Sequence, residues 1–167
     1  MHESTTEIEA LQQLLDETYK KAGVHYRSIH TPTRRMSAAE VCAQLEGVAI
    51  FDLATVSKLK KPVVAPVDGL FFKARLWFSS AESSIRFRHI RDNPYVSAAY
   101  TLGEEISIMI HGQAHEVDTS QPGHEALHEY CLETYGPSYD SWGLWGKSPF
   151  AWVQPSVMYA SRPGVDR

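Results

Sequence analysis

Residues 105–118 constrain the fold more than any other stretch, because apolar and more polar side chains alternate along them. Ile106, Ile108 and Ile110 occupy every second position. This period of two places the three isoleucines on one face, which predicts a long β-strand with one buried side. Such a strand needs neighbouring strands for its backbone groups and a core for its apolar face.

Five more segments have the apolar and β-branched composition of strands. They are residues 48–57, 62–72, 76–78, 96–101 and 150–160. Pro66 inside the second segment argues for an edge position or a bulge, because proline cannot donate to the ladder.

Five or six mainly antiparallel strands with a few short helices predict a mainly-β fold, a small β-barrel with helical additions. The chain of 167 residues is long enough for one domain with a sizeable core. We therefore expect a single domain over residues 1–167, with a helical N-terminal extension over about residues 1–46.

Capping boxes mark two helices of this extension. Ser4 with Glu7 precedes an amphipathic stripe, and Ser37 with Glu40 begins a shorter helix. Residues 24–35 between them are expected to be irregular.

Composition limits the classes of partner. The formal net charge of −4 gives no general attraction to nucleic acid or to an anionic membrane. We expect no signal peptide and no membrane-spanning segment, and the two cysteines are too few for a disulfide framework. We expect a cytoplasmic protein whose anion sites, where present, are local.

Residues 75–96 join a strand to a helix through a turn rich in serine. Ser79 and Glu82 match a capping box, and Arg86 follows within the helix. A helix N-terminus offers unpaired N–H groups and a partial positive charge, so hydroxyls and a guanidinium gathered there can bind a phosphate. The alternative is a well-capped surface helix with a solvated basic face.

A further helix, residues 122–135, contains the pattern H-E-x-x-H between His124 and His128. That spacing can place two imidazoles on one helical face to bind zinc. The positions where an extended zinc-protease pattern needs glycine and histidine hold Cys131 and Thr134. We therefore expect an ordinary surface helix and no metal site.

The order of the strand segments resembles that of the pyridoxamine 5'-phosphate oxidase-like superfamily, the flavin- and deazaflavin-binding split β-barrels. The segments that carry the resemblance are residues 51–56, 62–67 and 76–80, the helix at 84–91 and the strand at 108–117. The resemblance covers roughly residues 47–118. It implies an antiparallel, Greek-key-like split barrel of the FMN-binding type.

In such proteins the second strand runs beside the isoalloxazine ring, and the turn and helix after the third strand hold the phosphate. By resemblance, the residues that would line the ring are Ala65, Pro66 and Val67. Those that would surround the phosphate are Phe78, Ser79, Ser80, Ser84 and Arg86. Ser107 resembles a further ring-contacting position on a later strand.

The chain also departs from the pattern of this superfamily. The turn at residues 57–61 lacks the usual Asp-Gly, and Ala65 stands where a serine is common. No arginine–histidine substrate motif of true pyridoxamine phosphate oxidases lies near the C-terminus. The resemblance therefore implies the superfamily and not that particular activity.

The implied function is that of an oxidoreductase. A homodimer would bind FMN, or alternatively the deazaflavin F420, at its subunit interface and transfer hydride or electrons to a small organic substrate. A non-catalytic flavin-binding or carrier module of the same fold is the alternative. No catalytic acid or base is singled out; His30, His111 and Tyr139 are conceivable proton donors.

F420 carries an acidic tail that benefits from an extended basic groove. The residues that could supply such a groove are Arg34, Arg35, Lys58, Lys60, Lys61, Arg86 and Arg88.

Overall fold

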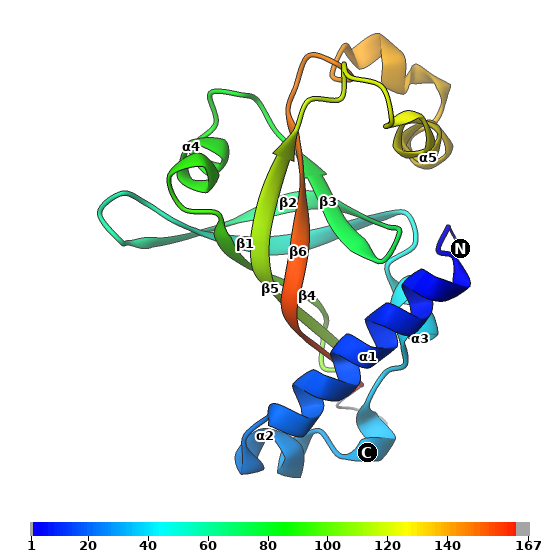
Figure 1. The fold of residues 1–167 in the computed structure, drawn as a ribbon, viewed down its shortest axis with the longest axis vertical. Helices are drawn as coiled ribbons and strands as arrows, with labels where there is room; N and C mark the ends of the chain where they lie inside the picture. The colour runs from blue at the N-terminus through cyan, green and yellow to red at the C-terminus, as the bar shows by residue number, and fades with distance from the viewer. Residues whose placement is uncertain (1, 163–167) are drawn as a thin grey trace.

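The computed structural model describes residues 2–162 of the chain. Its strands close into an antiparallel barrel in the spatial order β1-β2-β3-β6-β5-β4 (Figure 1). They are β1 (Val48–Val56), β2 (Pro62–Phe72), β3 (Arg75–Ser79), β4 (Tyr95–Leu102), β5 (Ile106–Val117) and β6 (Phe150–Ser161). A mainly-β barrel with helical additions confirms the fold predicted from the sequence.

Strand β5 pairs with β6 from Ser107 to Val117 and with β4 from Ile106 to Gln113. Ile106, Ile108 and Ile110 are buried, as their alternation predicts. The register with β6 shifts between His111 and Gly112, which forms an irregularity in an otherwise continuous ladder.

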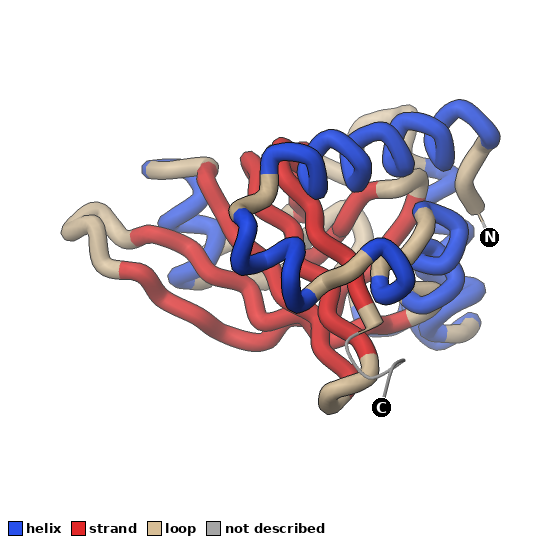
Figure 2. Tube along the Cα trace, turned by 90° about the horizontal axis from the view of Figure 1, so that it is seen from below, coloured by secondary structure: helices blue, strands red, loops and turns tan. Residues whose placement is uncertain are grey.

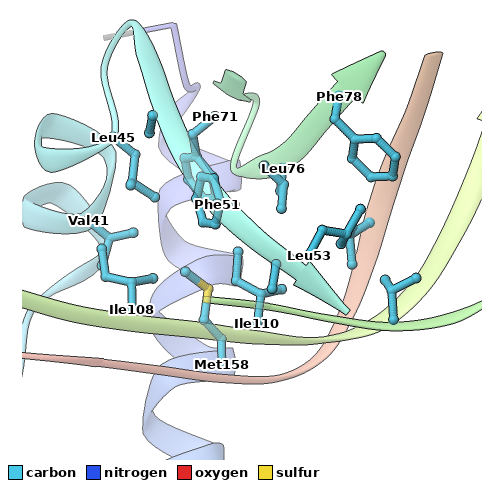
Figure 3. Packing of buried hydrophobic residues seen from close by; sticks show 14 of the residues in the cluster. Val41, Leu45, Phe51, Leu53, Phe71, Leu76, Phe78, Ile108, Ile110 and Met158 are labelled. Atoms are coloured by element: carbon cyan, nitrogen blue, oxygen red, sulfur yellow. The ribbon is translucent and has the colours of Figure 1, made fainter. Parts of the chain in front are cut away.

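Side chains from opposite walls of the barrel meet in one continuous core (Figure 3). Phe51 and Leu53 of β1 face Ile108 and Ile110 of β5, with Met158 of β6 beside them. All five are at most 2 % exposed. The barrel interior is therefore filled, and a ligand has to bind on its outside or between it and the helices.

The two capping boxes begin helices where the sequence predicts them. Ser4 caps α1 (Thr5–Lys21) and Ser37 caps α3 (Ala38–Gln44), and each serine hydroxyl accepts a hydrogen bond from the backbone N–H of the glutamate three residues on. Helix α1 packs against β6, where the Thr18 hydroxyl accepts from the backbone N–H of Met158 at 3.2 Å. Figure 2 shows this first helix after the N-terminus lying across the strands of the barrel.

The expectation of an irregular segment at residues 24–35 is wrong. The chain forms α2 (Val24–Ile29) and the 3-10 helix η1 (Pro32–Arg34). Neither has a side-chain cap, so the residue pattern that identified the other helices is missing. Among the helices of residues 2–162, none combines the length and apolar character needed to cross a bilayer.

Helix α4 (Ile85–Asp92) begins later than the Ser79–Glu82 pattern predicts. Ser84 is its N-cap and accepts from the backbone N–H of Phe87 at 3.3 Å. Ser79 cannot take that role, because it ends β3 and its hydroxyl donates to the carbonyl of Pro149 at 3.0 Å.

A second apolar cluster lies outside the barrel, beneath α5 (Glu125–Tyr135) and the 3-10 helix η2 (Pro137–Trp142). Leu70 and Trp77 of the sheet pack there against Tyr130 and Cys131 of α5. Figure 1 shows α5 and η2 at the same end of the molecule as α4, whereas α1 and α2 lie at the other end.

Close approach of β5 and β6 requires glycine at position 112. A Cβ there would lie 2.0 Å from the backbone oxygen of Gln154, which cannot move aside as a flexible side chain can. We expect Gly112→Ala to lower the free energy of unfolding by about 3 kcal/mol or more, at or above the usual range for overpacking. Denaturant unfolding measures this difference.

Gly23→Ala is the matched control. Its φ of −63° suits alanine, and a Cβ there has no neighbour within 4 Å. We expect its stability to stay within about 1 kcal/mol of the wild type. An equal loss in the two variants would contradict the β5–β6 packing described here.

Candidate functional site

The predicted ring-binding stretch lies on β2, where side chains alternate between the two faces of the strand. Pro66 is exposed, Ala65 is half-buried and Val67 is buried at 6 % exposure. The Val67 side chain belongs to the barrel core. A ligand on the outer face of β2 would therefore contact the Pro66 side chain and the backbone of its neighbours.

The predicted phosphate-binding residues lie on the connection between β3 and α4. Because Gly69 pairs with Phe78 in the β2–β3 ladder, Ser79 and Ser80 continue the chain alongside Val67 and Asp68. The side chain of Phe78 is 1 % exposed and belongs to the core, so this residue can offer only its backbone.

Arg86 returns from α4 to the same part of β2. Its Nη2 donates to the backbone carbonyl of Pro66 at 2.9 Å, and no acidic side chain of residues 2–162 forms an ion pair with it. Burial lowers the pKa of its guanidinium, which is half-buried. A partly desolvated cation with a single carbonyl acceptor keeps further N–H donors available for an anion.

Arg91, further along α4, is already neutralised. Its Nε and Nη2 donate to the two carboxylate oxygens of Glu116 at 2.8 and 2.5 Å. The hydrogen bond to Glu116 raises the pKa of Arg91. The two arginines of one helix therefore differ in their capacity to bind a ligand.

A pocket of about 220 Å³ opens directly beside the β3–α4 connection. Ser79 and Ser80 form part of its wall, and Asp68 of β2 is the only charged residue among the described residues that line it. Tyr135 of α5 and Trp142 of η2 supply aromatic walls on the opposite side. The predicted serines thus lie between the Arg86 contact and an aromatic cavity.

No sequence pattern indicated Asp68, Tyr135 or Trp142 as site residues. The many aromatic residues after residue 135 indicate an apolar contact surface. Their spacing does not indicate which strand they pack against. That placement depends on packing between α5 and the β2–β3 hairpin, whose partners are distant in the chain.

Comparisons with known proteins show the fold. Neither a protein-family model nor a curated protein matches the chain. An FAD-binding protein from Mesorhizobium loti is 20 % identical, with a TM-score of 0.59 over 77 % of this chain and 94 % of that one. An F420 reductase is 18 % identical, with a TM-score of 0.53 over 70 % and 93 %. A putative pyridoxamine 5'-phosphate oxidase from Listeria innocua is 15 % identical, with a TM-score of 0.55 over 72 % and 91 %.

The chain has the split-barrel fold of the pyridoxamine 5'-phosphate oxidase-like proteins.

Ser107 is the one predicted cofactor residue that this split barrel separates from the others. It lies near the start of β5, opposite Thr101 of β4, whereas Pro66 of β2 lies opposite Asp52 of β1. Because β1 and β4 pair with each other, two strands stand between Ser107 and the Arg86 contact. One chain therefore does not bring Ser107 to the same ligand site.

The basic residues considered for an acidic cofactor tail fall into separate groups. Arg35 pairs with Asp16, and η1, which ends at Arg34, lies at the opposite end of the molecule from α4 (Figure 1). Lys58 and Arg88 instead line a pocket of about 460 Å³ between the β1–β2 turn and α4. Only this second group is near the β3–α4 connection.

The H-E-x-x-H pattern serves to hold η2 against α5. His124 is the N-cap of α5, and Nε2 of His128 lies 2.6 Å from Oδ1 of Asp140. The His128 ring also stacks on Trp145 at 4.5 Å. Within residues 2–162 no three histidine, cysteine or acidic side chains gather as a metal site would require.

Proposed function

We propose that this chain binds FMN on the outer side of β2, with its phosphate at the β3–α4 connection, and acts as an oxidoreductase on a small organic substrate. The observation that carries the proposal is Arg86, a half-buried cation that contacts the Pro66 carbonyl and has no carboxylate partner among the described residues. The fold shared with an FAD-binding protein and an F420 reductase supports it.

The residues around Arg86 fit a phosphate. Ser84 caps α4 through one acceptor, so its own O–H is free to donate, and the first N–H groups of the helix point the same way. The Ser80 hydroxyl has no side-chain partner within residues 2–162. Together they offer neutral and charge-assisted hydrogen bonds to one dianion.

A bound flavin would supply the hydride or electron chemistry, while the protein orients it and shapes the substrate pocket. The backbone of residues 65–67 is available to orient a ring along β2. The aromatic side chains of α5 and η2 would exclude water from the neighbouring cavity.

F420 is the alternative cofactor, and the observation that supports this alternative is the pocket between α4 and the β1–β2 turn. Arg88 and Lys58 line that pocket with His89. Lys58 is partly neutralised by Asp92 at 3.4 Å, whereas Arg88 has no such partner among the described residues. An acidic tail leaving the β3–α4 connection would meet these cations. Parallel titrations with FMN and F420 decide between the two.

A non-catalytic flavin carrier is the second candidate function, because the conceivable proton donors lie mostly elsewhere. His30 stacks on Tyr26 at 4.1 Å in the N-terminal extension, and Nδ1 of His111 lies 2.8 Å from the Ser97 hydroxyl. Of these three residues, only Tyr139 lines the pocket beside the β3–α4 connection. Protein that takes up FMN but never transfers electrons to any acceptor would support the carrier.

We also propose a homodimer formed through the outer face of β1 and β2. Ile50 and Val64 are 53 % and 61 % exposed there, and the hairpin that carries them projects from the barrel (Figures 1 and 2). Such apolar exposure is typical of an interface. In such a dimer, Ser107 of the partner subunit could contact the cofactor, whereas Ser107 of the same chain lies too far away.

Substitution of the exposed valine tests the dimer. We expect wild type to be dimeric at micromolar concentration and Val64→Asp to be monomeric, because the carboxylate would be desolvated in the interface. Light scattering measures the mass. Val24→Asp is the control, since Val24 is 77 % exposed on α2 at the other end of the molecule. A monomeric wild-type protein at this concentration would contradict the dimer proposal.

The phosphate assignment predicts different effects for two arginines of α4. A hydrogen bond to a charged group is worth about 1.5–3 kcal/mol, so Arg86→Ala should weaken FMN binding roughly ten- to a hundred-fold. Arg91→Ala should change it much less, because Arg91 is engaged by Glu116. Fluorescence titration of each purified variant with FMN gives the dissociation constants.

Both variants need an intact fold for this comparison. Loss of the Arg86 contact to Pro66 removes one hydrogen bond but also relieves the burial of a charge, so the net change in stability should be small. Equal FMN affinities for wild type, Arg86→Ala and Arg91→Ala would show that the β3–α4 connection does not hold the phosphate.

A further inference from the structure

The pocket of about 220 Å³ beside the β3–α4 connection is called the aromatic pocket from here on. Its lining residues indicate what kind of ligand it binds. Tyr135, Tyr139 and Trp142 form its aromatic walls, and Asp68 lies at its β2 side. Its volume of about 220 Å³ is below the range of about 300–1,000 Å³ usual for drug-sized ligands. The size fits a molecule with a single ring.

The three aromatic rings present surfaces in two orientations. Tyr135 and Tyr139 stack at 5.3 Å with nearly parallel planes. Trp142 stands against them at 5.5 and 5.6 Å, with interplanar angles of 65° and 71°. The three rings therefore form one packed aromatic cluster along the pocket, and a ligand ring can pack against it in the geometries that aromatic pairs favour.

Trp142 is also unusual in its exposure. The side chain is 50 % exposed, and Leu144 beside the pocket is 39 % exposed. The bond between His128 and Asp140 and the stacking of His128 on Trp145 hold this segment on α5. The exposed Trp142 therefore belongs to an anchored wall.

Asp68 sets the sign of the charge that the pocket accepts. The Asp68 carboxylate forms no hydrogen bond or ion pair within residues 2–162, and no cation is among the described residues that line the pocket. The carboxylate lies close enough to Tyr135 that, together with burial as the larger cause, it raises the pKa of that phenol to about 12. Both the carboxylate and the electron-rich ring faces attract a cation.

We propose that the aromatic pocket binds a small aromatic amine in its protonated form, with the ring against Trp142 and the Tyr135–Tyr139 pair and the ammonium beside Asp68. Ser148 lines the same pocket and offers a hydroxyl to any further polar group of the ligand. That such an amine is the substrate class of the flavin site rests on the proposed function. Binding itself does not, and is measured without cofactor.

Three one-ring probes that differ mainly in charge test the proposal on the cofactor-free protein. They are 2-phenylethylamine, 2-phenylethanol and phenylacetate, titrated by calorimetry or ligand-observed NMR at pH 7. We expect the amine to bind at least about tenfold more tightly than the alcohol, and the anion to bind most weakly. Equal affinities for amine and anion would overturn the proposal, as would no binding of the amine at millimolar concentration.

Two variants locate the interaction. Asp68→Asn should reduce amine affinity about tenfold while leaving the affinity for the alcohol unchanged. Trp142→Ala should weaken amine and alcohol together. Glu129→Gln is the matched control, because Glu129 is an exposed acid of α5 that does not line the pocket. Unchanged amine binding in Asp68→Asn would refute the placement of the ammonium.

The two proposals fail in different ways. Amine binding without any FMN or F420 binding would remove the cofactor assignment and with it the substrate role, but would support the aromatic pocket as a ligand site. FMN binding without the charge preference among the three probes would remove the pocket assignment alone. The alternative use of Trp142 and Leu144, as a contact between two copies of the chain, predicts that Trp142→Ala changes the mass in solution.

Discussion

In the closed barrel, the first and last parts of strand β2 have different neighbouring strands. Residues Gly69–Phe72 pair with β3, whereas the preceding residues pair with β1 alone. The β3–α4 connection folds beside this free edge, where Arg86 donates to the Pro66 carbonyl and Ser79 donates to the Pro149 carbonyl. These two hydrogen bonds join the segment from Ser79 to Arg86 to the edge of β2 and to the chain entering β6.

The parts of the fold with local causes were predictable. Alternation along β5 and the capping boxes of α1 and α3 depend on residues a few positions apart, and the structure confirms them. Ser79 shows the limit of such patterns, because a distant carbonyl takes the hydroxyl that a local pattern assigns to a helix cap. The aromatic residues of the pocket are dense after residue 135, but no local pattern pairs them with Asp68. Asp68 and Trp142 line one pocket only because α5 packs on the β2–β3 hairpin.

The β3–α4 connection and the aromatic pocket are neighbouring sites that carry charges of opposite sign. Arg86 makes the β3–α4 connection locally positive, although the chain as a whole carries a net charge of −4. Asp68 makes the aromatic pocket locally negative, and Ser79 and Ser80 lie between the two. A phosphorylated cofactor and a cationic substrate would each be directed to its own side by the charge it carries.

FMN and riboflavin differ only in the phosphate, so their relative affinity tests the role of the β3–α4 connection most directly. Both ligands are titrated into wild type and Arg86→Ala under identical buffer and salt conditions. We expect wild type to prefer FMN over riboflavin, and we expect Arg86→Ala to reduce this preference roughly ten- to a hundred-fold while leaving riboflavin affinity nearly unchanged. Equal binding of FMN and riboflavin to the wild type would contradict this role of the β3–α4 connection.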